Sequence, residues 1–107
     1  MSGTLDSIRQ LAREGLILVS EHGYDELTAH DIFVREVIEG IVGAVVVEDY
    51  PEYAKGPCVL VLQKDDKNLP IHIVWGIPKG QTSPAVLVTA YRPDPDLWEE
   101  GFLRRRK

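Results

Sequence analysis

Four strand-like runs joined by short turns constrain the fold of this chain more than any other feature. The runs are rich in apolar and β-branched residues, and they cover Ala44–Tyr50, Cys58–Gln63, Ile71–Trp75 and Val86–Tyr91. The segments between them contain Pro, Gly, Asp and Lys, and none is long enough for a crossover helix. Connections of this length join antiparallel neighbours, so the sequence predicts a four-stranded antiparallel meander.

Helical patterns precede this meander. Apolar residues recur at helical spacing over about residues 4–14, and Leu16–Ser20 is typical of a short strand or an extended segment. Thr28–Asp31 fits a capping box, and apolar residues follow it at i, i+3, i+4 and i+7. This pattern predicts a second helix over about residues 29–40.

A further helical pattern closes the chain. Asp94 is placed as an N-cap and Pro95 as the first helical residue, which predicts a short C-terminal helix. The 107 residues suffice for one domain, residues 1–107. The predicted fold class is therefore α+β, with helices packed on one face of the four-stranded meander.

Composition limits the classes of function. The formal net charge of −5 argues against simple electrostatic binding to nucleic acid. No apolar run approaches the ~20 residues of a membrane helix, and the first residues lack a signal-peptide pattern, so we expect no membrane association. A single cysteine, Cys58, is expected to be a buried, inert thiol, as in a cytoplasmic protein.

Metal and cofactor motifs are missing from the sequence. The three histidines lack the spacing of a zinc site, and one cysteine cannot complete a thiolate cluster. The chain has no Walker loop, no G-x-G-x-x-G and no G-x-S-x-G. We therefore expect neither a metal ion nor an organic cofactor.

Polar residues at strand ends are the candidate site. Tyr91 and Arg92 stand where the last strand gives way to the closing segment, and such positions offer side chains to a cleft. His72 interrupts an otherwise apolar strand, and His22 follows the Leu16–Ser20 segment. Each of these residues has a purely structural alternative, because most Tyr, Arg and strand His residues are structural.

A basic run ends the chain, at Arg104, Arg105, Arg106 and Lys107. Such a run is usually a solvated tail, and otherwise it contacts phosphate groups or an acidic partner. These four residues are therefore the candidate RNA- or partner-binding residues.

Several motifs together resemble one protein family. They are S-E-H at residues 20–22, E-D-Y-P at 48–51, K-G-P at 55–57, L-P-I-H-I-V at 69–74 and T-A-Y-R-P-D-P-D-L-W at 89–98. In these motifs the chain resembles the small bacterial and cyanobacterial proteins of domain-of-unknown-function family 4258. That family is similar to ribonuclease toxins of the RelE-like superfamily, and its members occur beside zinc-finger antitoxin genes of the MqsA type.

The resemblance implies a small toxin that cleaves RNA and pairs with an antitoxin of the zinc-finger or helix-turn-helix type. The family's histidines fall on His22 and His72, and its Y-x-P motif falls on Tyr91 and Arg92. In metal-free cleavage the two histidines share proton transfer, Tyr91 donates to or positions the phosphate, and Arg92 stabilises the phosphorane. A homodimer is a further possibility.

A non-catalytic interaction module is the alternative function. In that case His72, Tyr91 and Arg92 form a structural hydrogen-bonded cluster, and an apolar surface around Trp75 and Trp98 binds a protein partner. The acidic net charge favours this alternative. So does the lack of two arginines that many relatives carry after the first histidine.

Overall fold

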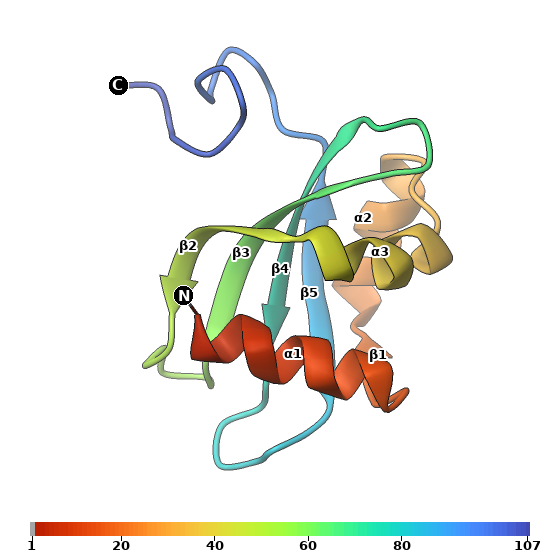
Figure 1. Cartoon of the computed structure of the whole chain (residues 1–107), viewed down its shortest axis with the longest axis vertical. Helices are drawn as coiled ribbons and strands as arrows, with labels where there is room; N and C mark the ends of the chain where they lie inside the picture. Colours follow the sequence, from red (N-terminus) through yellow and green to blue (C-terminus); the bar gives the residue numbers. More distant parts are fainter. Residues whose placement is uncertain (1) are drawn as a thin grey trace.

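A five-stranded sheet with three α-helices makes up the computed structural model, which describes residues 2–107 (Figure 1). The helices are α1 Gly3–Arg13, α2 Glu21–Ala29 and α3 Val34–Gly40, and a 3-10 turn, η1, covers Ile41–Gly43. The strands are β1 Ile17–Val19, β2 Val45–Tyr50, β3 Cys58–Lys64, β4 Pro70–Gly76 and β5 Ala85–Tyr91. The α+β class predicted from the sequence is confirmed.

The sheet is mixed, with the strand order β1-β5-β4-β3-β2. Strands β2 to β5 form the predicted antiparallel meander, but β1 adds a fifth strand that pairs parallel to β5. The predicted sheet of four antiparallel strands is therefore wrong. Ile17 lies opposite Ala85, far away in the sequence, so the pairing leaves no local pattern.

One face of the sheet, here called the first face, carries the helices α1 and α3 (Figure 1). Helix α1 begins after Ser2, whose side chain accepts a hydrogen bond from the amide of Leu5. The apolar side of α1 then packs on β3, β4 and β5. Trp75 is fully buried in this core, and its indole donates to Gln63, whose amide donates to the Val37 carbonyl.

Two helices, rather than the predicted single helix over residues 29–40, occupy the stretch after β1. Helix α2 ends at Ala29 in a Schellman motif, in which the amide of Ile32 donates to the Leu27 carbonyl and that of Asp31 to the Thr28 carbonyl. Asp31 has a φ of 55°, which is the left-handed conformation of this motif. The residues read as a helix start are therefore a helix stop, and α3 begins at Val34.

The predicted C-terminal helix is also absent from the described residues. After Asp94 the chain makes one turn, in which the Asp94 carbonyl accepts from the amides of Leu97 and Trp98. It then folds back, so that Trp98 and Arg105 form an isolated antiparallel bridge. Residues 93–107, here called the C-terminal segment, form an irregular loop above the sheet (Figure 1).

No helix within residues 2–107 is both long enough and apolar enough to cross a membrane.

Candidate functional site

The candidate site lies on the sheet face opposite α1 and α3, here called the second face. Alternation along β4 sends Ile71, Ile73 and Trp75 into the core and leaves His72 and Val74 on the second face. In the strand register His72 lies directly opposite Tyr91 of β5. The sheet therefore brings these two predicted residues together.

Tyr91 and His72 are joined by a hydrogen bond. The Tyr91 hydroxyl oxygen lies 3.1 Å from Nδ1 of His72, and Nε2 of the same ring lies 2.8 Å from the Phe102 carbonyl oxygen. A carbonyl only accepts hydrogen bonds, so Nε2 carries the ring proton. In the neutral ring Nδ1 is then the acceptor, and Tyr91 donates to it.

The C-terminal segment encloses the His72 ring. Trp98 packs edge-on against it with 4.4 Å between ring centroids, and the exposed fraction of His72 is 0%. Burial lowers the pKa of His72 below its ordinary 6.5, and the nearby positive charge of Arg105 lowers it further. His72 is therefore neutral at physiological pH.

Tyr91 is the half-buried member of the pair. Its ring packs edge-on against His72, and burial raises the pKa of its phenol above the ordinary 10.0. The hydroxyl therefore keeps its proton at neutral pH. Because His72 is enclosed, Tyr91 is the member of the pair that offers surface to a ligand.

His22 lies near this pair without touching it. It is exposed in the first turn of α2, and its Nε2 is 3.3 Å from the Thr89 hydroxyl. Thr89 lies opposite Val74, so it belongs to the second face. It precedes Tyr91 by two residues, or about 7 Å along a strand. His22 and Tyr91 therefore flank one patch of the second face.

The α2 helix owes this position to Ser20. The Ser20 side chain accepts from the amide of Gly23 and donates to the Val88 carbonyl, which ties the helix start to β5. Gly23 permits the close approach, because a Cβ there would lie 2.6 Å from the Leu87 carbonyl oxygen. These contacts fix His22 beside β5.

The Arg92 side chain points towards the turn between β3 and β4. Its guanidinium lies 2.9 Å from the Asp65 carboxylate and donates to the Pro70 carbonyl at 3.4 Å. Burial of Asp65 disfavours its charge, but hydrogen bonds from the Leu69 amide, from Arg92 and from the Lys67 amide outweigh it and lower the pKa of that carboxyl. The structure therefore does not group Arg92 with His72.

The C-terminal basic run is divided between two roles. Arg105 makes a bidentate ion pair with Glu48, with both N–O distances 3.0 Å, and lies over the Trp98 ring at 4.7 Å. Arg106 donates to the Pro95 carbonyl at 2.7 Å. All four residues of the run are exposed, but in the described part of the chain only Arg105 and Arg106 have side-chain contacts that hold the C-terminal segment in place.

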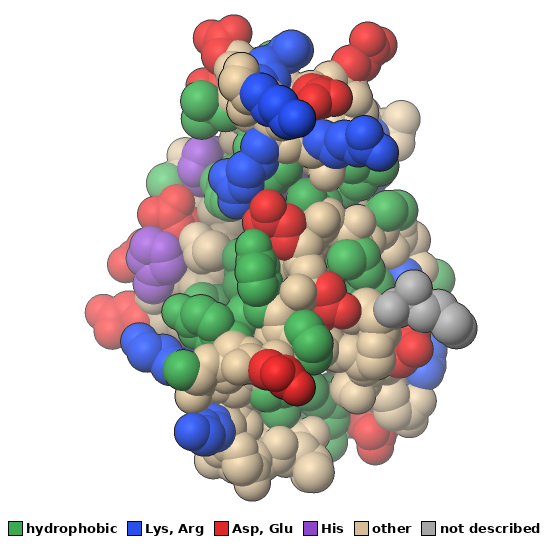
Figure 2. All heavy atoms as spheres, turned by 90° about the vertical axis from the view of Figure 1, so that its left-hand side faces the viewer, with side chains coloured by type: hydrophobic (Ala, Val, Ile, Leu, Met, Phe, Trp, Pro, Cys, Tyr) green, Lys and Arg blue, Asp and Glu red, His purple; other side chains and the backbone are tan. Residues whose placement is uncertain are grey.

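The surface of the C-terminal segment carries both basic and acidic side chains. Figure 2 shows Lys and Arg side chains gathered at the end of the molecule where the C-terminal segment lies, with Asp and Glu beside them. The Arg105 hydrogen bond is the main cause that lowers the pKa of Glu48. No group of three or more His, Cys, Asp or Glu side chains within residues 2–107 is placed to hold a metal ion.

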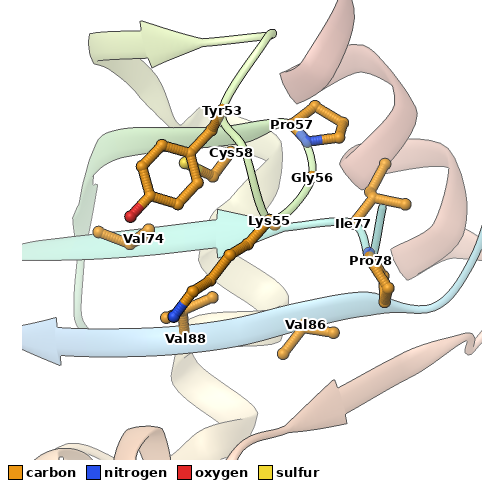
Figure 3. Close-up of a pocket in the computed structure, with 11 residues that line it drawn as sticks. Tyr53, Lys55, Gly56, Pro57, Cys58, Val74, Ile77, Pro78, Val86 and Val88 are labelled. Atoms are coloured by element: carbon orange, nitrogen blue, oxygen red, sulfur yellow. The ribbon is translucent and has the colours of Figure 1, made fainter. Parts of the chain in front are cut away.

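An open pocket of about 480 Å³ adjoins the site on the second face (Figure 3). Its floor includes Val74, Val86 and Val88, and Tyr53 and Lys55 of the β2–β3 loop also line it. Cys58, expected to be buried, is half-buried in this lining, and burial raises the pKa of its thiol.

Several residues of the site were not found from the sequence. The Phe102 contact is made by a backbone carbonyl, for which a sequence has no side-chain signal. Glu48 and Thr89 lie in motifs that carry the family resemblance, but their contacts with Arg105 and His22 depend on the tertiary structure. Tyr53 and Lys55 lie in a turn-rich segment, and the K-G-P motif that begins at Lys55 does not show that the two side chains line a pocket.

One family model matches the chain. It is described as Domain of unknown function (DUF4258), and it matches residues 19–92, from the end of β1 to just beyond β5. This range is more than half of the chain and includes all four predicted catalytic residues. No curated protein and no solved structure matches, so the kinship with RelE-like toxins stays a prediction. The chain belongs to the DUF4258 family, a family of domains of unknown function.

Proposed function

We propose that this protein is a toxin-type endoribonuclease that cleaves RNA on the second face without a metal ion. The observation that carries the proposal is the Tyr91–His72 hydrogen bond with the exposed His22 beside it. A phenol backed by the neutral His72 imidazole, and the exposed His22 imidazole of α2 beside Thr89, would supply the two proton-transfer groups that RNA cleavage needs. The sequence resemblance to ribonuclease toxins supports the same reaction.

The proton for the attacking oxygen moves through Tyr91. The RNA 2′-hydroxyl gives its proton to the Tyr91 oxygen while Tyr91 passes its own proton to Nδ1 of His72. The 2′-oxygen forms a bond to phosphorus, the bond from phosphorus to the 5′-oxygen breaks, and His22 in its protonated form gives that oxygen a proton. The products are a 2′,3′-cyclic phosphate and a 5′-hydroxyl end. In this scheme Tyr91 and His22 touch the substrate, and His72 is a positioning residue that also stores the proton.

Arg92 has no part in this scheme, because the Asp65 carboxylate already pairs with its guanidinium. Its predicted role at the phosphorane requires that pair to open, and it stays a prediction. The antitoxin, the RNA substrate and a homodimer likewise remain predictions. An antitoxin that covers the second face would block access to Tyr91 and His22 together.

A non-catalytic interaction module is the second candidate function. The enclosure of His72, with both ring nitrogens hydrogen-bonded and no exposed surface, favours it. The docking surface predicted around Trp75 and Trp98 is wrong, because their exposed fractions are 0% and 3%. A partner of this module would have to bind elsewhere.

Cleavage of a single-stranded RNA by the purified protein in EDTA distinguishes the two functions. We expect 2′,3′-cyclic phosphate ends, and no cut at a nucleotide whose 2′-hydroxyl is replaced by hydrogen. The variants His22→Ala and Tyr91→Phe should each lose about 10²–10⁴-fold in rate. The matched control is His30→Ala, at the C-cap position that follows the same helix, which should cleave normally.

Expression in bacteria gives the cellular counterpart. Induction of the wild type should arrest growth and fragment total RNA, and the His22→Ala, Tyr91→Phe double variant should do neither. Intact RNA in both experiments with folded wild-type protein would overturn the ribonuclease and leave the interaction module.

A further inference from the structure

We propose that the pocket beside Tyr53 and Lys55 binds one nucleotide of a single-stranded RNA, with its base on the valine floor and a phosphate at Lys55. The inference rests on the proposed function of the same face and names where its substrate binds. Three features support it: the pocket is preformed, its lining suits a base with an attached anion, and its floor lies on the two strands that carry the His72–Tyr91 pair.

Backbone hydrogen bonds between two loops form the pocket. The Ile77 amide donates to the Pro57 carbonyl at 3.0 Å, and the Lys79 amide donates to the Lys55 carbonyl at 3.1 Å. Gly56 permits this contact, since its φ is 121° and a Cβ there would lie 2.1 Å from the Ile77 carbonyl oxygen. The pocket walls are therefore held in place before any ligand binds.

The lining suits a flat apolar group with a negative charge attached. Val74, Val86 and Val88 offer apolar side chains, and Lys55 is the single charged residue among those that line the pocket. Figure 3 shows the Tyr53 ring near Val74 and the Lys55 side chain extending over β5 towards Val88. A nucleobase stacks on aromatic and apolar side chains whatever its sequence, and a lysine adds a phosphate contact.

The position of the pocket beside the proposed cleavage site favours a nucleotide over other anions that carry an apolar group. The pocket floor lies on β4 and β5, the two strands that carry the His72–Tyr91 pair. Val74 of the pocket floor lies two residues from His72 on β4, or about 7 Å along the strand. An extended RNA with one base in the pocket would therefore place its neighbouring phosphate near Tyr91.

Binding of uncleavable RNA tests the proposal without relying on catalysis. The probes are 2′-O-methyl tetranucleotides, added to protein with isotope-labelled valine methyl groups and followed by NMR. We expect shifts at Val74, Val86 and Val88. Tyr53→Leu keeps an apolar side chain but removes the ring, and it should weaken binding about 5- to 100-fold.

The lysine contact has its own readout. Lys55→Gln should weaken binding. The logarithm of the binding constant should also fall less steeply with the logarithm of the salt concentration, by the slope that about one phosphate contact contributes. The matched controls are Tyr24→Leu on α2 and Lys67→Gln in the β3–β4 turn, which change exposed residues outside the pocket. Both controls should bind like the wild type.

The outcomes separate this inference from the proposed function. Pocket shifts in a protein that leaves unmodified RNA intact would support the nucleotide site and overturn the ribonuclease. RNA cleavage with no valine shifts and an unaffected Tyr53→Leu variant would overturn the pocket and leave the ribonuclease. Valine shifts with decanoate but with no tetranucleotide would also overturn the inference, because the ligand would then be an apolar carboxylate.

Discussion

Tyr91 donates a hydrogen bond to Nδ1 of His72 across two neighbouring strands, and this bond fixes the imidazole in its neutral Nε2–H form. The direction follows from the Phe102 carbonyl, which can only accept the proton on the opposite nitrogen. The pair thus ties the sheet to the C-terminal segment through one ring. Its removal has consequences for stability as well as for the proposed chemistry.

Loss of the Tyr91 hydroxyl should destabilise the fold. Tyr91→Phe leaves Nδ1 of the fully buried His72 without a donor, which costs about 1–3 kcal/mol of the free energy of unfolding. Urea denaturation measures this change. Tyr24→Phe is the control, because Tyr24 is 60% exposed and its hydroxyl has no such partner to leave unsatisfied. Equal stabilities for the two variants would contradict the buried hydrogen bond.

Stability should fall as the pH drops below about 6.5. Burial lowers the pKa of His72 in the folded state, so on acidification the unfolded chain takes up a proton at this residue first. The free energy of unfolding therefore decreases from the unfolded-state pKa down to the folded one. Glu48 and Asp65, whose pKa values are also lowered, act only from their ordinary 4.5 and 3.8 downwards.

Denaturation curves between about pH 7 and pH 5 isolate the histidine contribution. His72→Gln cannot titrate at this residue and should flatten this part of the profile. An NMR titration of the wild type gives the folded-state pKa of His72 directly. A value at or above 6.5 would be incompatible with the enclosed ring.

The Arg92–Asp65 pair should be worth more than an exposed ion pair. The Asp65 side chain is only 5% exposed, so Arg92→Ala leaves a nearly buried carboxylate without its cation and should cost about 1–3 kcal/mol. The exposed pair between Arg35 and Asp66 is the matched control, and Arg35→Ala should cost at most about 1 kcal/mol. A double-mutant cycle with Asp65→Ala measures the coupling. Additive single effects would refute the pairing.

The C-terminal segment should open more readily without Arg105. Arg105→Ala removes the ion pair with Glu48 and the contact over Trp98, each worth about 0.5–1 kcal/mol at an exposed position. Hydrogen exchange at the Glu99 and Arg106 amides, which bond within the segment, should therefore quicken about five- to thirtyfold. Arg104→Ala is the control. Unchanged exchange in both variants would show that Arg105 does not hold the segment.

The meander could be predicted from the sequence because its signals are local. Strands β2 to β5 alternate or run apolar over several residues, and turn residues separate them. Strand β1 has three residues, and its partner lies far along the chain at Ala85–Leu87. The periodicity of apolar residues in a short stretch of sequence does not indicate a pairing between such distant segments. The parallel fifth strand could therefore not be predicted.

The predicted boundaries of the second helix were wrong for a different reason. Thr28–Asp31 contains residue types that cap the start of a helix and also occur where a helix stops. The helix stops here because Leu27 and Ile32 are both buried, the Ile32 amide donates to the Leu27 carbonyl, and Asp31 adopts a positive φ. A second helix then starts at Val34 after a short extended connection.

The site was predicted in part. His72 and Tyr91 stood out as polar residues at strand positions, but their contact depends on the register between β4 and β5. Arg92 also stood out, yet its partner Asp65 reads in the sequence as an ordinary solvated turn residue. Residue type thus located the candidates, and only tertiary structure decided which of them meet.

The place of β5 in the sheet has a consequence for synthesis on the ribosome. This strand comes last in the chain but lies between β1 and β4, so it fills an inner position. Until residues 85–91 have left the exit tunnel, β1 has no strand to pair with and β4 has an open edge. The nascent chain therefore cannot complete its sheet strand by strand in the order of synthesis, because β1 and β4 are joined only when β5 inserts between them.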